Sequence, residues 1–108
     1  MPPVAKAIPA VYDAVFNAQR GFIPLAFLRA LAYSESGLDP TQDMLDKPGA
    51  NSSAVGLFQV MNSVLSDWNL RHPEETYTRE YLKDPKVNTR IAVALLERII
   101  KSYTANHR

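Results

Sequence analysis

One glutamate stands where a predicted helix should end, which is a setting suited to acid–base chemistry. Residues 24–40 read PLAFLRALAYSESGLDP, in which Pro24 can open a helix and Gly37 can close it. Four residues at helical spacing should share one face: Leu28, Leu31, Ala32 and Glu35. Burial on that face and the negative end of the helix dipole would both favour a protonated Glu35 carboxyl. We therefore take Glu35 as the candidate general acid, the alternative being a solvent-exposed glutamate beyond the last turn.

A second segment that could contribute to a functional site is the apolar run AVGLFQV at residues 54–60, which contains one amide side chain. Gly56 would let backbone or ligand approach closely because it has no side chain. The Gln59 amide needs hydrogen-bond partners if it is buried in this run. A bond to substrate and a bond to a loop carbonyl both satisfy that need, and the sequence leaves both open.

Composition limits the functional classes that remain. The 108 residues are 46% apolar and 21% charged, which predicts one soluble domain over residues 1–108. A net charge of +1 argues against broad electrostatic binding to nucleic acid. The chain has no cysteine, and His72 and His107 lack metal-ligand spacing, so we expect no metal and no cofactor.

Targeting signals are not visible in the sequence. The first ten residues contain three prolines and no continuous apolar stretch of the kind a signal peptide carries. The most apolar stretch, residues 22–33, includes Arg29 and is too short to span a bilayer. We therefore predict no membrane span, with delivery by other means or by a leader since removed.

The elements that must position these residues are nearly all helical. Helices or helical turns are predicted over residues 5–19, 24–36, 64–70, 78–82 and 85–103. A long polar loop, residues 37–53, separates the first two helices from the rest, with a short helical turn near residues 41–45. The last helix should bury an apolar stripe made of Val87, Ile91, Ala94, Leu95 and Ile99. No alternating strand pattern appears, so we predict a mostly α fold with little or no β-structure.

Three short motifs in a fixed order connect these elements to a known family. They are ESGLDP at residues 35–40, GLFQVM at residues 56–61, and Asp84-Pro85 followed by Asn88. This set resembles the catalytic domain of soluble lytic transglycosylases, the goose-type-lysozyme-like (SLT) family. The chain departs from the family pattern at Phe58, where methionine is usual, and it has no clear counterpart of the closing Ala-Tyr-Asn helix.

The resemblance implies a small lysozyme-like helical domain with a long active-site loop. It also implies cleavage of the MurNAc-GlcNAc β-1,4 bond of peptidoglycan, with Glu35 acting first as acid and then as base to give a 1,6-anhydro product. The substrate-binding residues that it implies are Ser36, Ser53, Gly56, Phe58, Gln59, Val60 and Asn88. The residues alone favour structural roles for Ser36, Gly56 and Asn88.

Two alternatives stay open at this point. One of Asp39, Asp43 and Asp46 could hold a water opposite Glu35, which would make the protein a hydrolysing muramidase. The other alternative is a non-catalytic module that binds peptidoglycan or joins an assembly. We expect action at the cell envelope, in the periplasm or from a phage particle, and a larger secretion, conjugation or phage assembly as partner.

Overall fold

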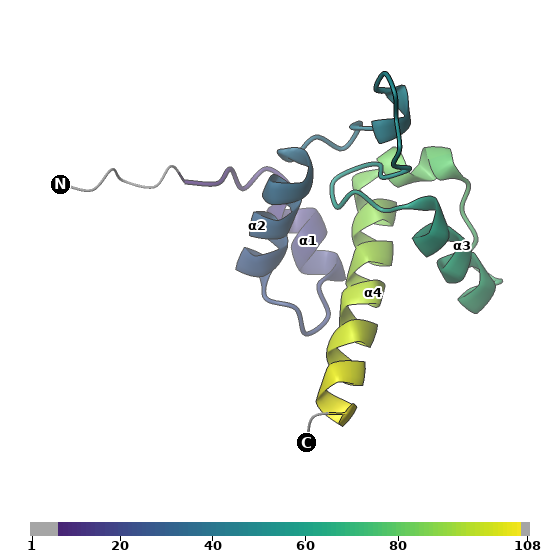
Figure 1. Ribbon diagram of the computed structural model, residues 1–108. Coiled ribbons are helices and arrows are strands. Elements are labelled where there is room, and N and C mark those ends of the chain that lie inside the picture. The colour runs from purple at the N-terminus through teal and green to yellow at the C-terminus, as the bar shows by residue number, and fades with distance from the viewer. Residues whose placement is uncertain (1–6, 107–108) are drawn as a thin grey trace.

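The computed structural model describes residues 7–106, which are mostly helical (Figure 1). Within this range, four α-helices and two short 3₁₀ helices follow one another in the order α1 (Asp13–Gln19), α2 (Leu25–Ser36), η1 (Met44–Asp46), α3 (Asn62–Arg71), η2 (Arg79–Lys83) and α4 (Pro85–Asn106). Strands are absent from the described residues, where Val55 forms only isolated bridges with Asp43 and with Val60. The predicted mostly α fold is confirmed.

The long helix α4 is the element against which the others pack. Helices α1, α3 and η2 all contact it, and α2 packs on α1 (Figure 1). The core contains side chains from every α-helix and from the 54–60 segment, and its least exposed large members are Phe16, Ile23, Leu28, Leu57, Leu82, Ile91 and Val55. The two segments with candidate site residues, 24–36 and 54–60, therefore pack around one shared core.

Helix α2 ends as predicted but begins one residue later. Pro24 has an extended backbone, and its carbonyl accepts hydrogen bonds from the Phe27 and Leu28 amides, so it precedes the helix. Gly37 closes the helix with φ 65°, a left-handed conformation that glycine adopts without steric cost. The buried positions are Leu28, Ala32 and Ser36, each four residues after the last.

Helix α1 is shorter than the predicted helix over residues 5–19. It begins at Asp13, and residues 7–10 have no regular structure, while residues 5 and 6 lie outside the described range. The reason is Pro9, whose ring disfavours the helical conformation of Ile8 and which donates no backbone hydrogen bond. The prediction was wrong over this first part.

Helix α4 extends past the predicted end at Tyr103 to Asn106. Its apolar stripe is core-facing only in the first half, since Ile91 is 1% exposed but Ile99 is 55% exposed. Figure 1 shows why, because the C-terminal half of α4 projects past the other helices. The predicted burial of Ile99 was therefore wrong. Across residues 7–106, no helix has the length and apolar character needed to cross a bilayer.

Loop and turn predictions were correct in outline. The loop over residues 37–53 contains a helical turn, η1, at residues 44–46 rather than 41–45. Helix α3 starts at Asn62, two residues before the predicted start at residue 64. The turn η2 spans Arg79–Lys83, one residue later than the predicted turn over residues 78–82.

Candidate active site

Glu35 lies in the wall of an open groove between α2, the 58–61 segment and α4. The groove has a volume of about 290 Å³ and is lined by Leu31, Glu35, Phe58, Gln59, Val60, Met61, Val64, Ala92, Leu95 and Leu96. Its lining is mainly apolar, and Glu35 is the one ionisable side chain among the described residues that form it. Three of the predicted site residues, Phe58, Gln59 and Val60, are brought together with Glu35.

Glu35 itself is exposed in this structure, so its predicted burial was wrong. The core-facing side of α2 passes through Ser36 instead, and Glu35 lies next to it on the groove side. Burying Ser36 costs little because its hydroxyl finds acceptors, whereas burying an unpaired carboxylate is expensive. The carboxyl is thus open to any ligand that enters the groove.

The Ser36 hydroxyl ties the end of α2 to the turn that follows Val55. Its Oγ lies 3.1 Å from the Ala32 carbonyl oxygen and 2.8 Å from the Leu57 carbonyl oxygen, and can donate to either. Ser36 is buried and is not among the residues that line the groove. Its role is to position Glu35 relative to the turn rather than to contact a ligand.

Asn88, near the start of α4, fixes the same turn. Its Nδ2 donates to the Val55 and Leu82 carbonyls, at 2.9 Å each, and its Oδ1 accepts from the Phe58 amide at 2.8 Å. The side chain is fully buried. The predicted substrate contact of Asn88 is therefore corrected to a structural one, since all its polar atoms are bonded inside the protein.

Gly56 permits this arrangement because it brings backbone against the Asn88 amide. Its φ is 84°, and a Cβ built there would lie 2.2 Å from Asn88 Nδ2 and 2.4 Å from the Leu82 carbonyl oxygen. No side chain fits in that space. Gly56 is thus required for packing and turn geometry, and it makes no side-chain contact with a ligand.

Gln59 is held by its own side chain at the edge of the groove. Its backbone is left-handed, with φ 52°, which is uncommon for a residue other than glycine. Its Nε2 donates to the Gly56 carbonyl at 2.9 Å and to the Gln42 carbonyl at 3.3 Å. Within the described residues Oε1 has no hydrogen bond, so Gln59 satisfies loop carbonyls and also keeps an acceptor for a ligand.

Comparison with known proteins decides the family. The family model described as "Transglycosylase SLT domain" matches residues 14–108. The chain belongs to the SLT domain family. Among solved structures, the 70 kDa soluble lytic transglycosylase SLT70 from Escherichia coli is similar, with a TM-score of 0.75 and 23% identity. That match covers 89% of this chain and 15% of the SLT70 chain. No curated protein matches the chain.

Other predicted site residues of this SLT domain lie differently. Phe58 is mostly buried and packs edge-on against Phe16, with ring centroids 5.4 Å apart, so it offers the groove only part of one edge. Ser53 does not line the groove, and its Oγ accepts a hydrogen bond from the Asn62 amide at 2.9 Å. A ligand contact by Ser53 thus finds no support in the geometry.

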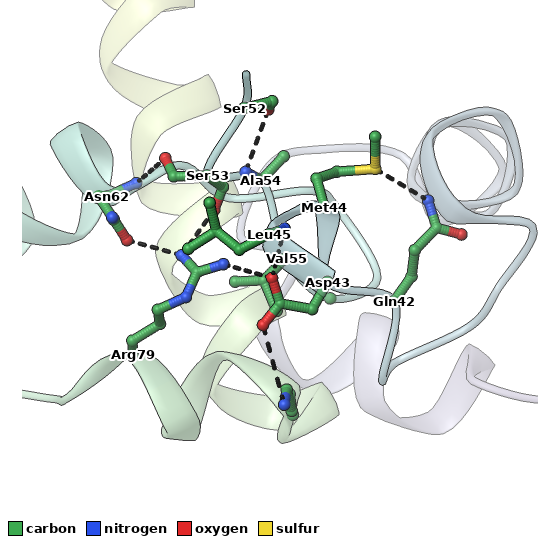
Figure 2. Close-up of polar contacts among 12 residues, drawn as sticks. Gln42, Asp43, Met44, Leu45, Ser52, Ser53, Ala54, Val55, Asn62 and Arg79 are labelled. Carbon is green, nitrogen blue, oxygen red and sulfur yellow. Dashed lines mark hydrogen bonds and ion pairs between the residues drawn. The ribbon is translucent and has the colours of Figure 1, made fainter. Parts of the chain in front are cut away.

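The three loop aspartates also lie outside the groove lining. Asp39 forms a local turn, in which its Oδ1 accepts from the Thr41 amide and hydroxyl. Asp43 is buried beside Arg79 (Figure 2). Lys83 Nζ lies 3.8 Å from its Oδ2. Burial raises the pKa of the Asp43 carboxyl, but hydrogen bonds from the Leu45 amide and the Arg79 guanidinium lower it by more. The net pKa is therefore below its usual value.

Sequence reasoning missed Arg79, Gln42 and the loop contacts that they make. Arg79 lies in a stretch predicted only as a short helical turn, and its partner Asp43 is 36 residues away. No local pattern predicts such a pairing. In residues 7–106 no group of three or more histidine, cysteine, aspartate or glutamate side chains could hold a metal ion, and His107 lies outside that range.

Proposed function

We propose that this SLT domain is a peptidoglycan lytic transglycosylase. It cleaves the β-1,4 bond between MurNAc and GlcNAc and leaves a 1,6-anhydro ring on the muramic sugar. Glu35 is the catalytic residue, and the glycan strand lies in the groove between α2, the 58–61 segment and α4. The SLT70 enzyme of similar fold is named a lytic transglycosylase, which supports the same reaction class here.

The observation that carries the proposal is the single ionisable side chain in the groove. Glycosidases that use water generally need two carboxylates, one as acid and one as base or nucleophile. Glu35 is the only carboxylate among the described groove-lining residues, and Asp39, Asp43 and Asp46 are not among them. A reaction that one carboxyl group can complete alone fits this lining best.

The chemistry balances with Glu35 as both acid and base. In the first step its carboxyl proton passes to the glycosidic oxygen, and the bond from that oxygen to C1 of MurNAc breaks. In the second step the resulting carboxylate takes the proton of the C6 hydroxyl while O6 bonds to C1. Water is not consumed, and Glu35 ends protonated as it began.

Bound glycan would supply the desolvation that the free groove lacks. Glu35 is exposed here, but the walls of the groove are apolar side chains such as Leu31 and Leu96. A sugar ring packed on those walls excludes water, which strengthens the interaction of the carboxyl with the glycosidic oxygen. The free Oε1 of Gln59 can accept a hydrogen bond from a sugar hydroxyl or acetamido N–H at the same time.

The substrate also bears on location and partners. Peptidoglycan glycan strands are the proposed ligand, so the protein acts at the cell envelope, in the periplasm, or from a phage particle that meets the wall. A larger secretion, conjugation or phage assembly is the proposed setting. Neither a cofactor nor a metal takes part in the proposed steps.

The test is mass spectrometry of soluble muropeptides released from purified peptidoglycan. Wild type should release products one water lighter than hydrolysed ones, and Glu35→Gln should release none. Glu74→Gln serves as the matched control, because Glu74 is exposed and lies outside the groove lining. It should release the same products as the wild type.

Two other outcomes would replace the proposal. Reducing-end products with an added water would indicate a muramidase and direct attention to the loop aspartates. Binding to peptidoglycan without release by folded wild-type protein would indicate a non-catalytic module. Release that persists in Glu35→Gln would remove Glu35 from its assigned role.

A further inference from the structure

Arg79 joins three segments of the chain that flank the groove. Its Nη1 donates to the Ser53 carbonyl at 2.6 Å and to Asn62 Oδ1 at 2.7 Å, and its Nη2 donates to Asp43 Oδ1 at 2.5 Å. Figure 2 shows the guanidinium between the Asp43 carboxylate and the Ser53–Asn62 pair. One side chain thus joins the interior of the long loop at Asp43, its end at Ser53 and the start of α3.

The pair formed by Arg79 and Asp43 is shielded from water. The Asp43 side chain is 7% exposed and the Arg79 side chain 22% exposed. Asp43 Oδ1 also accepts from the Leu45 amide at 3.0 Å, and Lys83 Nζ lies 3.8 Å from Oδ2. Removing Arg79 leaves the buried Asp43 carboxylate with only the more distant Lys83 cation and the Leu45 amide, which is more disruptive than losing a surface pair.

The peptide link between Asp43 and Gln42, followed by hydrogen bonds, connects this pair to the groove. Asp43 forms an isolated β-bridge with Val55. The carbonyl of its neighbour Gln42 accepts a hydrogen bond from the Gly56 amide at 2.8 Å. The same Gln42 carbonyl accepts from Gln59 Nε2 at 3.3 Å. The position of Asp43 therefore determines where the carbonyl that holds the Gln59 carboxamide lies.

We propose that Arg79 and Asp43 are positioning residues that hold the loop and, through the Gln42 carbonyl, orient Gln59 in the groove. The part that concerns sugar binding rests on the proposed function, whereas the orientation of Gln59 does not. Neither Arg79 nor Asp43 lines the groove, so both act on a ligand only through Gln59.

The first experiment follows the Gln59 side chain by NMR in the full chain. The sequence has three glutamines, Gln19, Gln42 and Gln59, and Gln59→Ala identifies the resonance pair of interest. Arg79→Ala should shift the Gln59 carboxamide signals and speed hydrogen exchange at the Met44 and Gly56 amides. Unchanged Gln59 signals and unchanged exchange would overturn the proposal.

Two further variants control this experiment. Arg71→Ala removes an arginine whose ion pair with Asp67 is exposed and lies on α3 away from the groove lining, so the Gln59 signals should stay in place. Arg79→Lys keeps the charge but loses the planar fork of donors, and should show smaller shifts in the same direction. It also keeps the test decisive if Arg79→Ala fails to fold.

The second experiment couples Arg79 to Gln59 through peptidoglycan kinetics. Arg79→Ala should raise the apparent KM by about tenfold and change kcat by less than about threefold, because Glu35 is untouched. In a Gln59→Ala background, Arg79→Ala should have no further effect on KM, since the two residues act in series. Additive effects would overturn the proposal. If wild type releases no product, the proposed function fails while the NMR experiment still decides the orientation of Gln59.

Discussion

The Ser36 hydroxyl oxygen lies 2.8 Å from the carbonyl oxygen of Leu57, which bonds the end of α2 to the turn that carries Gln59. Ser36 follows Glu35 directly, and Leu57 lies two residues before Gln59. This one contact therefore fixes the two sides of the groove relative to each other. The placement of the Glu35 carboxyl and the Gln59 amide in one groove thus depends on a hydroxyl that lies outside the groove lining.

We expect Ser36→Ala to lower the free energy of unfolding by about 1–2 kcal/mol, because the buried Leu57 carbonyl loses its donor. Urea denaturation would measure this. Ser34→Ala, at an exposed position of the same helix, is the control and should change stability by less than about 0.5 kcal/mol. Equal effects of the two substitutions would contradict the assigned role of Ser36.

Gly56→Ala should destabilise the protein by more than about 3 kcal/mol, since a new methyl group must overlap the Asn88 amide and the Leu82 carbonyl. Gly49 offers a matched comparison, with φ 67° and no atom within 4 Å of a built Cβ. Gly49→Ala should cost only the left-handed backbone strain, about 1–2 kcal/mol. Thermal unfolding followed by circular dichroism separates the two, and a similar loss at both sites would show that packing at Gly56 is unimportant.

The two halves of α4 should respond differently to loss of the same side chain. Ile91→Ala removes a fully buried group and should cost about 2–5 kcal/mol. Ile99→Ala removes an exposed group and should change stability by less than about 0.5 kcal/mol. Denaturant midpoints of both variants check this, and a large effect of Ile99→Ala would mean that the projecting half is covered in solution.

Stability should fall on acidification because several carboxyl groups have lowered pKa values in the folded protein. The pKa of Glu75 is lowered chiefly by its hydrogen bonds from Arg90 and then Tyr77, and that of Asp43 by the contacts described above. A pKa that is lower in the folded state stabilises the fold above the unfolded-state value, here 4.5 for Glu75 and 3.8 for Asp43, and that stabilisation is lost as the pH falls.

Urea midpoints measured from about pH 6 down to about pH 2 would test this expectation. The free energy of unfolding should begin to decline near the unfolded-state values and continue below them. Asp43→Asn should show a shallower decline than wild type, because one of the contributing carboxyl groups is gone. A decline with the same slope in the variant would mean that Asp43 contributes nothing.

Features encoded by neighbouring residues were predictable from the sequence. Gly37 closes α2 as expected, and Asp84-Pro85 opens α4, because cap and proline preferences act within one helical turn. The resemblance to the SLT family implied that Glu35 and Gln59 share one site, and both residues line the groove. The helical class followed from the same local patterns.

Features set by distant contacts were not predictable in this way. Whether Glu35 or Ser36 faces the core depends on the Leu57 carbonyl, which the helical pattern of α2 does not contain. The prediction that Ile99 is buried failed for a similar reason, since periodicity shows that a helix has an apolar face but not whether another element covers it. Arg79 carried no signal at all, because its role depends on Asp43 36 residues earlier.

The Asn88 amide has a consequence for how the protein is made. It binds Phe58 across 30 residues of chain, so translation delivers Glu35 and Gln59 well before the group that shapes the turn between them. Contacts at such separation form late, because they require closure of a long loop. A nascent chain that ends before α4 would contain Glu35 but no assembled groove. The groove and the global fold should consequently form, and be lost, in one cooperative step.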